Sequence, residues 1–218
     1  MARDRKPVKS KGGRPSREQA AEINGRILSA ATTLFLKRGV DGTSLEAIAA
    51  AAQIGKPTLY ARYPDKSALF AAVIRAQVDA AMPPITGVAE TATPAARLRQ
   101  VGRAVIEGAM KPVPLGLMRL YIAEAPRHGA LIREVDRLGR QAALEAIAGA
   151  LAGAGGADAI DRAHVVAAHF LDMVFVPHQM RALLGDVPDE ADPLHPTLDA
   201  RIETAIAAFK TMHLLPAE

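Results

Sequence analysis

Residues 43–66, TSLEAIAAAAQIGKPTLYARYPDK, decide the fold of this chain, because they predict two short helices joined by a tight turn. Thr43 and Glu46 have the spacing of a capping box, which marks the start of the first helix. The turn falls at residues 53–55, and the second helix is predicted at residues 56–63. A short helix held at a fixed angle by a buried predecessor is the arrangement that places side chains in the major groove of DNA.

The residues flanking the second helix support these boundaries. Gly55 can act as its N-cap, and Pro57 lies in the first turn, where a missing N–H loses no hydrogen bond. Pro64 ends the helix, and Asp65 can cap the helix that follows. The side chains expected to hold the two helices at their angle are Leu45, Ile48, Ala49, Ala52, Ile54 and Leu59.

This order of elements resembles the DNA-binding domain of the TetR family of one-component transcriptional regulators, over about residues 20–81. The matching residues are Phe35, Gly39, Gly42-Thr43, Ile48-Ala49, Ala52, Lys56-Pro57-Thr58-Leu59-Tyr60, Tyr63 and Lys66. The family usually has Gly where Gln53 stands, and often Ser where Gly55 stands. We therefore expect Gln53 to adopt the left-handed conformation, at a modest strain cost.

The side chains predicted to face DNA are mainly hydrogen-bond donors. Thr58 is suited to a base edge or a thymine methyl group, and the tyrosines and Lys66 are suited to phosphates. Thr43, at a helix start, is also placed to bind a phosphate. The resemblance implies backbone contacts for the tyrosines and Lys66, with Pro57 and Thr58 near bases. The predicted DNA-binding set is Thr43, Ser44, Lys56, Pro57, Thr58, Tyr60, Arg62, Tyr63 and Lys66. Alternatively, the tyrosines only cover the core of a small domain.

Composition favours an all-α protein. Half of the 218 residues are hydrophobic, aromatic residues make up 4%, and no alternating run of β-branched residues occurs. We expect about nine helices, with a helix-turn-helix domain first and a helical domain after it. The chain has no cysteine, which excludes disulfides and thiolate metal sites and fits the cytoplasm. A basic start without an apolar segment predicts no signal peptide, and no apolar run predicts a membrane span.

Charge divides the chain into three predicted parts. Residues 1–81 carry 14 basic and 7 acidic side chains, a net of +7, and residues 82–218 carry 13 and 16, a net of −3. A basic N-terminal third is typical of a nucleic-acid reader. We predict a disordered basic arm at 1–18, a DNA-binding domain at 19–81 with its helix-turn-helix at 44–63, and an effector-binding and dimerisation domain at 82–218. The arm either lies on DNA or only solubilises the chain.

Proline and glycine residues mark the predicted helix boundaries in the C-terminal part. Pro94 opens one helix, and Pro112 and Pro114 end it. Further helices are predicted at Leu115–Ala125, Ala130–Leu151, Ala159–Leu184, with a kink at Pro177, and Leu198–Met212. This part resembles the ligand-binding and dimerisation domain of the TetR family, and the run from Leu117 to Ala130 loosely resembles its AefR-like group.

The resemblance implies a homodimer that binds a small molecule. The last two helices have apolar faces suited to a four-helix bundle across a two-fold axis, although the same residues can fill the core of one chain. An apolar pocket between the middle helices would suit a hydrophobic or aromatic effector. Its predicted lining is Met118, Tyr121, Ile122, His169, Phe170, Met173 and Phe175.

No pattern indicates a metal, a cofactor or an enzyme. His164, His169 and His178 share one predicted helix, but spacings of 5 and 9 do not align them on one face. The chain also lacks a glycine-rich phosphate loop, a nucleophile elbow and a paired-carboxylate motif.

The sequence therefore predicts a ligand-responsive repressor that binds a near-palindromic operator as a homodimer. Three alternatives remain. The chain could be a non-specific architectural DNA binder, a regulator that acts through a partner protein and has no cavity, or a small-molecule protein with a vestigial helix-turn-helix.

Overall fold

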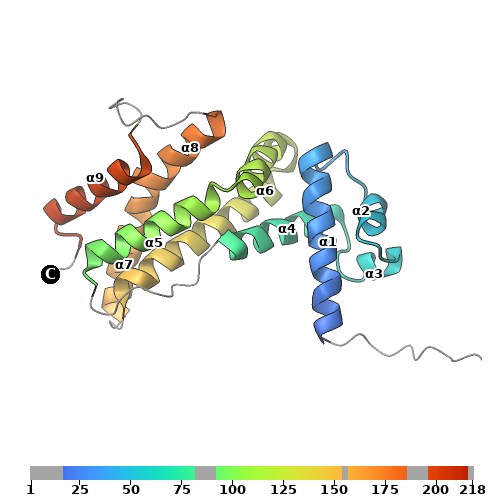
Figure 1. Ribbon diagram of the computed structural model, residues 1–218, viewed down its shortest axis with the longest axis horizontal. Helices are drawn as coiled ribbons and strands as arrows, with labels where there is room; N and C mark the ends of the chain where they lie inside the picture. The colour runs from blue at the N-terminus through green and yellow to red at the C-terminus, as the bar shows by residue number, and fades with distance from the viewer. Residues whose placement is uncertain (1–16, 82–91, 154–156, 186–195, 216–218) are drawn as a thin grey trace, which may run out of the picture.

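Four helices form the N-terminal end of the molecule (Figure 1). They are α1 (Arg17–Arg38), α2 (Leu45–Ala51), α3 (Lys56–Tyr60) and α4 (Lys66–Ala81). Helices α2 and α3 lie on the outer side of α1, and α4 runs from it toward the rest of the chain. The computed structural model describes residues 17–81, 92–153, 157–185 and 196–215, so nearly all of the predicted arm and the predicted domain junction lie outside it.

Most of the C-terminal helices lie at the positions that the sequence predicts. They are α5 (Pro94–Ala109), α6 (Pro112–Ala152), α7 (Ala157–Phe170), the π-helical turn η1 (Leu171–Phe175), α8 (Val176–Leu184) and α9 (Leu198–Thr211). Every regular element in the described ranges is helical, which confirms the predicted all-α class. None of these helices is both long enough and apolar enough to cross a membrane.

Two of the predicted breaks take a different form from the one expected. Pro112 begins α6 and does not merely end α5, because a proline is tolerated in the first turn of a helix. The break predicted near Pro126 is a kink within α6, where His128 has φ −122° and ψ 34°. The kink predicted at Pro177 follows η1, in which the Val176 N–H bonds to the Leu171 carbonyl.

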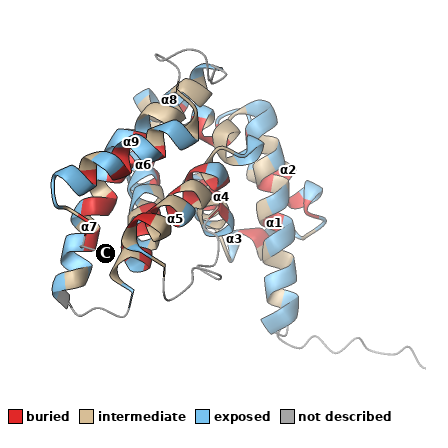
Figure 2. Ribbon diagram, turned by 60° about the vertical axis from the view of Figure 1, so that its left-hand side comes forward, coloured by how far each residue is buried: buried red, intermediate tan, exposed pale blue. Residues whose placement is uncertain are grey.

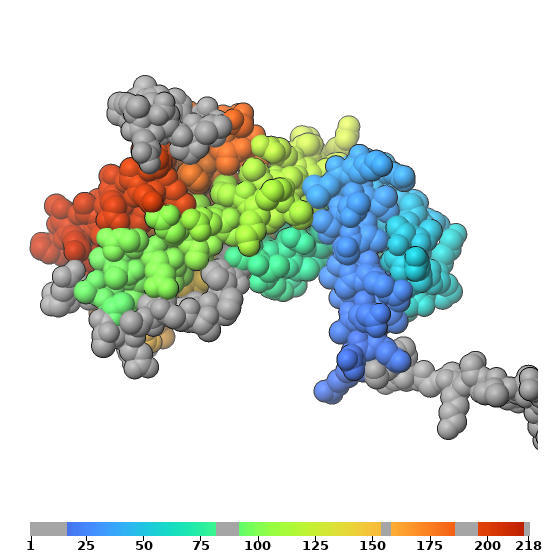
Figure 3. Space-filling model, in the orientation of Figure 1, coloured from blue at the N-terminus to red at the C-terminus, as the bar shows by residue number. Residues whose placement is uncertain are grey.

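The core of the N-terminal helices continues into α6. Phe35 of α1 and Phe70 of α4 meet edge to face, with ring centroids 5.4 Å apart, and both are fully buried. Leu117 and Val135, from the two halves of α6, belong to the same buried cluster. In the space-filling view α4 lies between α1 on one side and α5 and α6 on the other (Figure 3). Helix α4 therefore connects the helix-turn-helix to the C-terminal part.

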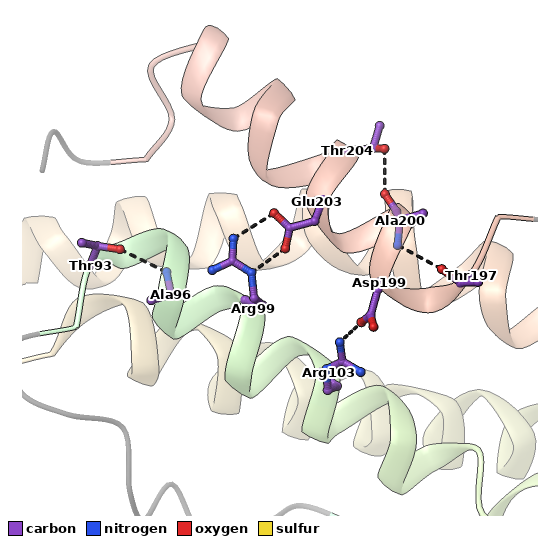
Figure 4. Close-up of polar contacts among 9 residues, drawn as sticks. All are labelled: Thr93, Ala96, Arg99, Arg103, Thr197, Asp199, Ala200, Glu203 and Thr204. Atoms are coloured by element: carbon purple, nitrogen blue, oxygen red, sulfur yellow. Dashed lines mark hydrogen bonds and ion pairs between the residues drawn. The ribbon is translucent and has the colours of Figure 1, made fainter. Parts of the chain in front are cut away.

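A second core joins α5, α6, α7 and α9, and buried residues line the faces where these helices meet (Figure 2). At its centre Phe170 packs on Gly102, where an added Cβ would lie 2.4 Å from the Phe170 ring. Two ion pairs, Arg99 with Glu203 and Arg103 with Asp199, hold α9 on α5 (Figure 4). The apolar face of α9 is thus buried within the single chain.

Candidate nucleic-acid interface and effector cavity

The sequence predicts Thr43 as the N-cap of α2, but the N-cap in the structure is Ser44. The Ala47 N–H donates to the Ser44 Oγ at 3.1 Å. Thr43 is 1% exposed, and its hydroxyl donates to the carbonyls of Gly39 at 2.8 Å and Leu34 at 3.2 Å. The Thr43 side chain therefore ties α2 to the end of α1. The prediction that the Thr43 side chain binds a phosphate is therefore wrong, because a buried hydroxyl cannot reach DNA.

The turn between α2 and α3 has the geometry that the sequence predicts. Gln53 has φ 54°, in the left-handed region, and Gly55 is the N-cap of α3 without a side-chain bond. Pro57 lies in the first turn of α3. Helix α3 ends at Tyr60, earlier than the predicted residue 63. Asp65 caps α4, with the Ala68 N–H donating to its Oδ1 at 2.7 Å.

Helix α3 presents polar side chains on its outer surface. Lys56, Pro57 and Tyr60 are exposed, and Thr58 and Arg62 are half-buried. The Tyr60 hydroxyl donates to Glu46 Oε1 at 3.0 Å, and the Lys56 Nζ lies 3.9 Å from the same oxygen. That hydrogen bond raises the pKa of Tyr60. Glu46 therefore holds the side chains of α2 and α3 together at the solvent face.

Tyr63 and Lys66 are placed by other elements. The Tyr63 hydroxyl donates to Asn24 Oδ1 of α1 at 2.7 Å. Partial burial raises the pKa of Tyr63. The Lys66 ammonium donates to the Asp41 carbonyl at 3.3 Å, at the start of α4. An open hollow of about 400 Å³ lies between Lys66 and the start of α2. Its lining is Arg38, Asp41, Gly42, Thr43, Ser44, Leu45, Glu46, Tyr60 and Lys66.

An apolar cavity of about 350 Å³ lies between α4 and the C-terminal helices. Helix α4 provides part of its wall, together with α5, both halves of α6, η1 and α8. The lining residues are Ile74, Gln77, Val78, Ala81, Ala109, Pro114, Leu117, Met118, Tyr121, Val135, Asp136, Gly139, Arg140, Ala143, Leu171, Phe175, Val176 and Gln179. The cavity thus touches α4, the helix that follows α3 in the chain.

Few polar groups reach this cavity. Burial, aided by the nearby charge of Asp136, raises the pKa of Tyr121 to about 12, so its phenol stays protonated at neutral pH. Arg140 is paired with Asp172 at 2.8 Å, and Gln77 and Gln179 add neutral amides. An uncharged, largely apolar molecule with a few hydrogen-bonding groups would match this lining.

The predicted pocket residues divide into two groups. Met118, Tyr121 and Phe175 line the cavity. Ile122 is 50% exposed, Met173 is 42% exposed and His169 is exposed, so these three predictions are wrong in their placement. Phe170 is fully buried in the second core and does not line the cavity.

One face of α7, η1 and α8 is apolar and exposed. Its members are Val165, Met173, Val176, Met180 and Leu184, and from Met173 onward they recur every three or four positions. Other apolar residues of α7 and η1, namely Val166, Phe170, Leu171 and Val174, are buried within the chain. Ile202, Ile206 and Phe209 of α9 are buried there too.

Two family descriptions match the chain. The family "Bacterial regulatory proteins, tetR family" matches residues 27–73, and "AefR-like transcriptional repressor, C-terminal domain" matches residues 96–211. Among curated proteins, the HTH-type transcriptional regulator RutR of Escherichia coli is 36% identical over 95 residues. That match covers 44% of this chain and 44% of RutR, so the chain spans less than half the length of this relative.

Two solved structures resemble the whole fold. A TetR-family transcriptional regulator from Mesorhizobium loti has a TM-score of 0.67 and 25% identity, and covers 91% of this chain and 98% of its own. The flavonoid-responsive regulator FrrA has a TM-score of 0.67 and 27% identity. The match covers 88% of this chain and 97% of the FrrA chain.

Proposed function

The chain belongs to the TetR family of DNA-binding transcriptional regulators, and we propose that it is a homodimeric repressor released from its operator by a small apolar effector. The observation that carries this proposal is the cavity, because its wall includes α4. Helix α4 begins at Lys66, a short turn after the proposed recognition helix α3 ends at Tyr60. A molecule bound in the cavity therefore touches the helix that sets the position of α3.

The proposed DNA surface is the outer face of α3 and the hollow beside α2. Thr58 and Lys56 lie on α3, and Tyr60, Arg62 and Lys66 surround its end. We propose that the α3 residues enter the major groove and that Ser44, Tyr63 and Lys66 lie against the flanking phosphates. The basic residues before Arg17 would add phosphate contacts, which makes binding weaken steeply with salt.

The exposed apolar face of α7 and α8 supports a two-fold dimer. Five apolar side chains along one surface leave an area that a second copy would cover. A symmetric dimer would present two α3 helices to two half-sites of a near-palindrome. Effector binding would favour a dimer with a different α3 spacing, and it can do so only through its higher affinity for that form.

The effector is proposed to be a neutral, flat aromatic compound. A volume of about 350 Å³ suits a drug-sized molecule, and the lining offers apolar walls with the Tyr121 phenol as a neutral donor. FrrA, which this chain resembles over most of its length, is described as flavonoid-responsive. The cavity also speaks against a regulator that acts only through a partner protein, because that alternative predicts a filled core.

A footprint on the DNA upstream of the gene tests this proposal. The expected result is protection of a two-fold symmetric site, which is lost when a panel of flavonoids and related phenols includes the effector. Protection without symmetry, or uniform coverage that disappears with salt, would instead support a non-specific DNA binder.

A further inference from the structure

Three side chains that commonly bind metals meet where the DNA-binding end touches the C-terminal part. Asp41 lies in the turn between α1 and α2, and Glu124 and His128 lie on α6 at its kink. One ligand atom from each of the three lies within 4.8 Å of the others. The His128 Nε2 is 3.4 Å from Asp41 Oδ1 and 3.9 Å from Glu124 Oε2.

Glu124 indicates that this cluster is more than an exposed group of acids. Its side chain is more than nine-tenths buried, and its Oε2 has no hydrogen-bond partner in the described part of the chain. The His128 Nε2 is buried and has no hydrogen-bond partner there either. A buried carboxylate oxygen that lacks a partner is unfavourable, so a cation that fills the space between these atoms would stabilise the fold.

We propose that Asp41, Glu124 and His128 form a binding site for a divalent transition metal of the Zn²⁺ type. Zinc binds imidazole nitrogen and carboxylate oxygen at about 2.0–2.2 Å, which places ligands in a tetrahedral site about 3.4 Å apart. The distances from His128 Nε2 to the Asp41 and Glu124 carboxylates, 3.4 Å and 3.9 Å, lie near this value, so small side-chain rotations suffice. A set of one imidazole and two carboxylates suits zinc better than calcium, which prefers oxygen ligands only.

Arg127 is the competitor for this position. Its guanidinium Nη1 lies 3.9 Å from both Asp41 Oδ2 and Glu124 Oε2, beyond hydrogen-bonding distance. Its side chain is 70% exposed, so it can move to solvent at small cost. Without a metal, the Arg127 guanidinium would supply the positive charge beside the two carboxylates. With a metal, the two carboxylates would bind it directly.

The site would join two parts of the protein that the cavity also contacts. The N-terminal half of α6 carries Glu124 and also Leu117, Met118 and Tyr121, which line the cavity. Asp41 immediately precedes the segment that leads into α2. A bound metal would therefore fix the α1–α2 turn against the kink in α6. The site itself does not depend on the proposed repressor function.

Full-length protein without a histidine tag, stripped with a chelator and then titrated with Zn²⁺ alone, tests the proposal. We expect one Zn²⁺ per chain, a rise in Tm, and, with Co²⁺ in its place, the visible absorption of a low-symmetry site. Glu124→Gln, His128→Gln and Asp41→Asn should each weaken Zn²⁺ binding by at least about tenfold. Arg127→Gln should tighten it, because a competing cation is removed.

His164→Gln is the matched control. The His164 Nε2 lies 3.4 Å from Glu145 Oε2, a histidine–carboxylate pair that is not part of a three-ligand cluster in the described residues. This variant should keep the full Zn²⁺ affinity. If folded Glu124→Gln and His128→Gln proteins bind Zn²⁺ as well as the parent, or if Arg127→Gln weakens binding, the cluster is only an ion-pair contact and the proposal is wrong.

Discussion

The Tyr60 hydroxyl donates a hydrogen bond to Glu46 Oε1 at 3.0 Å and thereby joins the recognition helix α3 to α2. Both side chains are exposed, so this carboxylate lies on the surface that we propose faces phosphates. Glu46 thus acts in two opposed ways. It positions Tyr60, and it places a negative charge beside DNA, which weakens binding through repulsion.

Glu46→Gln is expected to raise operator affinity by about two- to fivefold at low salt, because the amide can still accept the Tyr60 bond but carries no charge. A gel-shift titration at fixed salt measures this change. The pKa of Tyr60 should fall back toward its ordinary value, which a phenol absorbance titration can follow because the chain has 3 tyrosines. Unchanged affinity would place Glu46 away from the DNA.

The same contact makes a contribution to stability that depends on pH. Because the folded pKa of Tyr60 is raised, its contribution is present below the unfolded value of about 10 and is lost as pH rises through the folded value. The pKa of Glu46 is lowered, first by a bond to its own backbone N–H and then by Tyr60. Its contribution is lost as pH falls through that lowered pKa.

Lys56 and Thr58 should have distinguishable roles on α3. Lys56→Ala is expected to weaken binding to all sequences and to reduce the salt dependence by about one phosphate contact, because Lys56 carries only charge. Thr58→Ala should lower affinity for the operator about tenfold with the salt dependence unchanged. Affinity measured between low and high salt separates these effects.

Arg162→Ala is the control for charge, since Arg162 is an exposed cation on α7, far from α3 (Figure 1). It should bind DNA like the parent. An equal loss of affinity in Arg162→Ala and Lys56→Ala would mean that net charge alone governs binding. Normal binding by Thr58→Ala, Arg62→Ala and Tyr60→Ala would move the contact surface elsewhere.

Two glycines should respond in opposite directions to the same substitution. A Cβ at Gly108 would lie 2.3 Å from the Ala81 carbonyl oxygen, so Gly108→Ala should push α5 from α4 and destabilise the fold by about 1–3 kcal/mol. Gly149 is exposed on α6 with nothing within 4 Å of that position. Gly149→Ala should therefore stabilise the protein by about 0.5–1 kcal/mol. Urea denaturation measures both changes, and a stable Gly108→Ala protein would contradict the close contact.

Local patterns predicted the helices well, but they could not choose between adjacent hydroxyls. Thr43 and Ser44 are both residue types that cap helices. Ser44 caps α2 because the Thr43 hydroxyl instead donates to the carbonyls of Leu34 and Gly39, at the end of α1. The left-handed conformation of Gln53 was predictable because the family that the sequence resembles usually has Gly at this position. Contacts within a few residues are thus visible in sequence, whereas contacts between helices are not.

The cavity residues show the same limit. The sequence places Met118, Tyr121 and Ile122 on one helix, but the face of that helix that borders the cavity depends on the helices packed around it. Met173 lies within the π-helical turn and is 42% exposed, and sequence spacing does not reveal such a turn. Histidine spacing predicted no metal site, because the proposed ligands come from segments that only the fold brings together.

The apolar face of α7 and α8 predicts where charge disrupts the dimer. Met180 is 52% exposed in the single chain and lies on this face. Met180→Glu would place a carboxylate inside the proposed two-fold interface, once from each copy, so the protein should become monomeric. Light scattering after size-exclusion chromatography measures the mass. Val113→Glu is the control, because Val113 is 38% exposed on α6 outside this face and should leave the dimer intact.

Filling the cavity should separate effector response from DNA binding. Ala143 is buried on α6 and lines the cavity, so Ala143→Leu would add three carbon atoms to a space of about 350 Å³. The variant is expected to fold, because the added atoms enter empty volume, and to bind the operator like the parent. Its affinity for an active phenol should fall about tenfold or more, because the ligand and the new side chain cannot share the space.

Ala207→Leu, an exposed change on α9, is the control and should alter neither DNA binding nor ligand affinity. Operator release measured against ligand concentration tests this directly. If Ala143→Leu is released as readily as the parent, the effector binds elsewhere and α4 does not transmit its effect from this cavity.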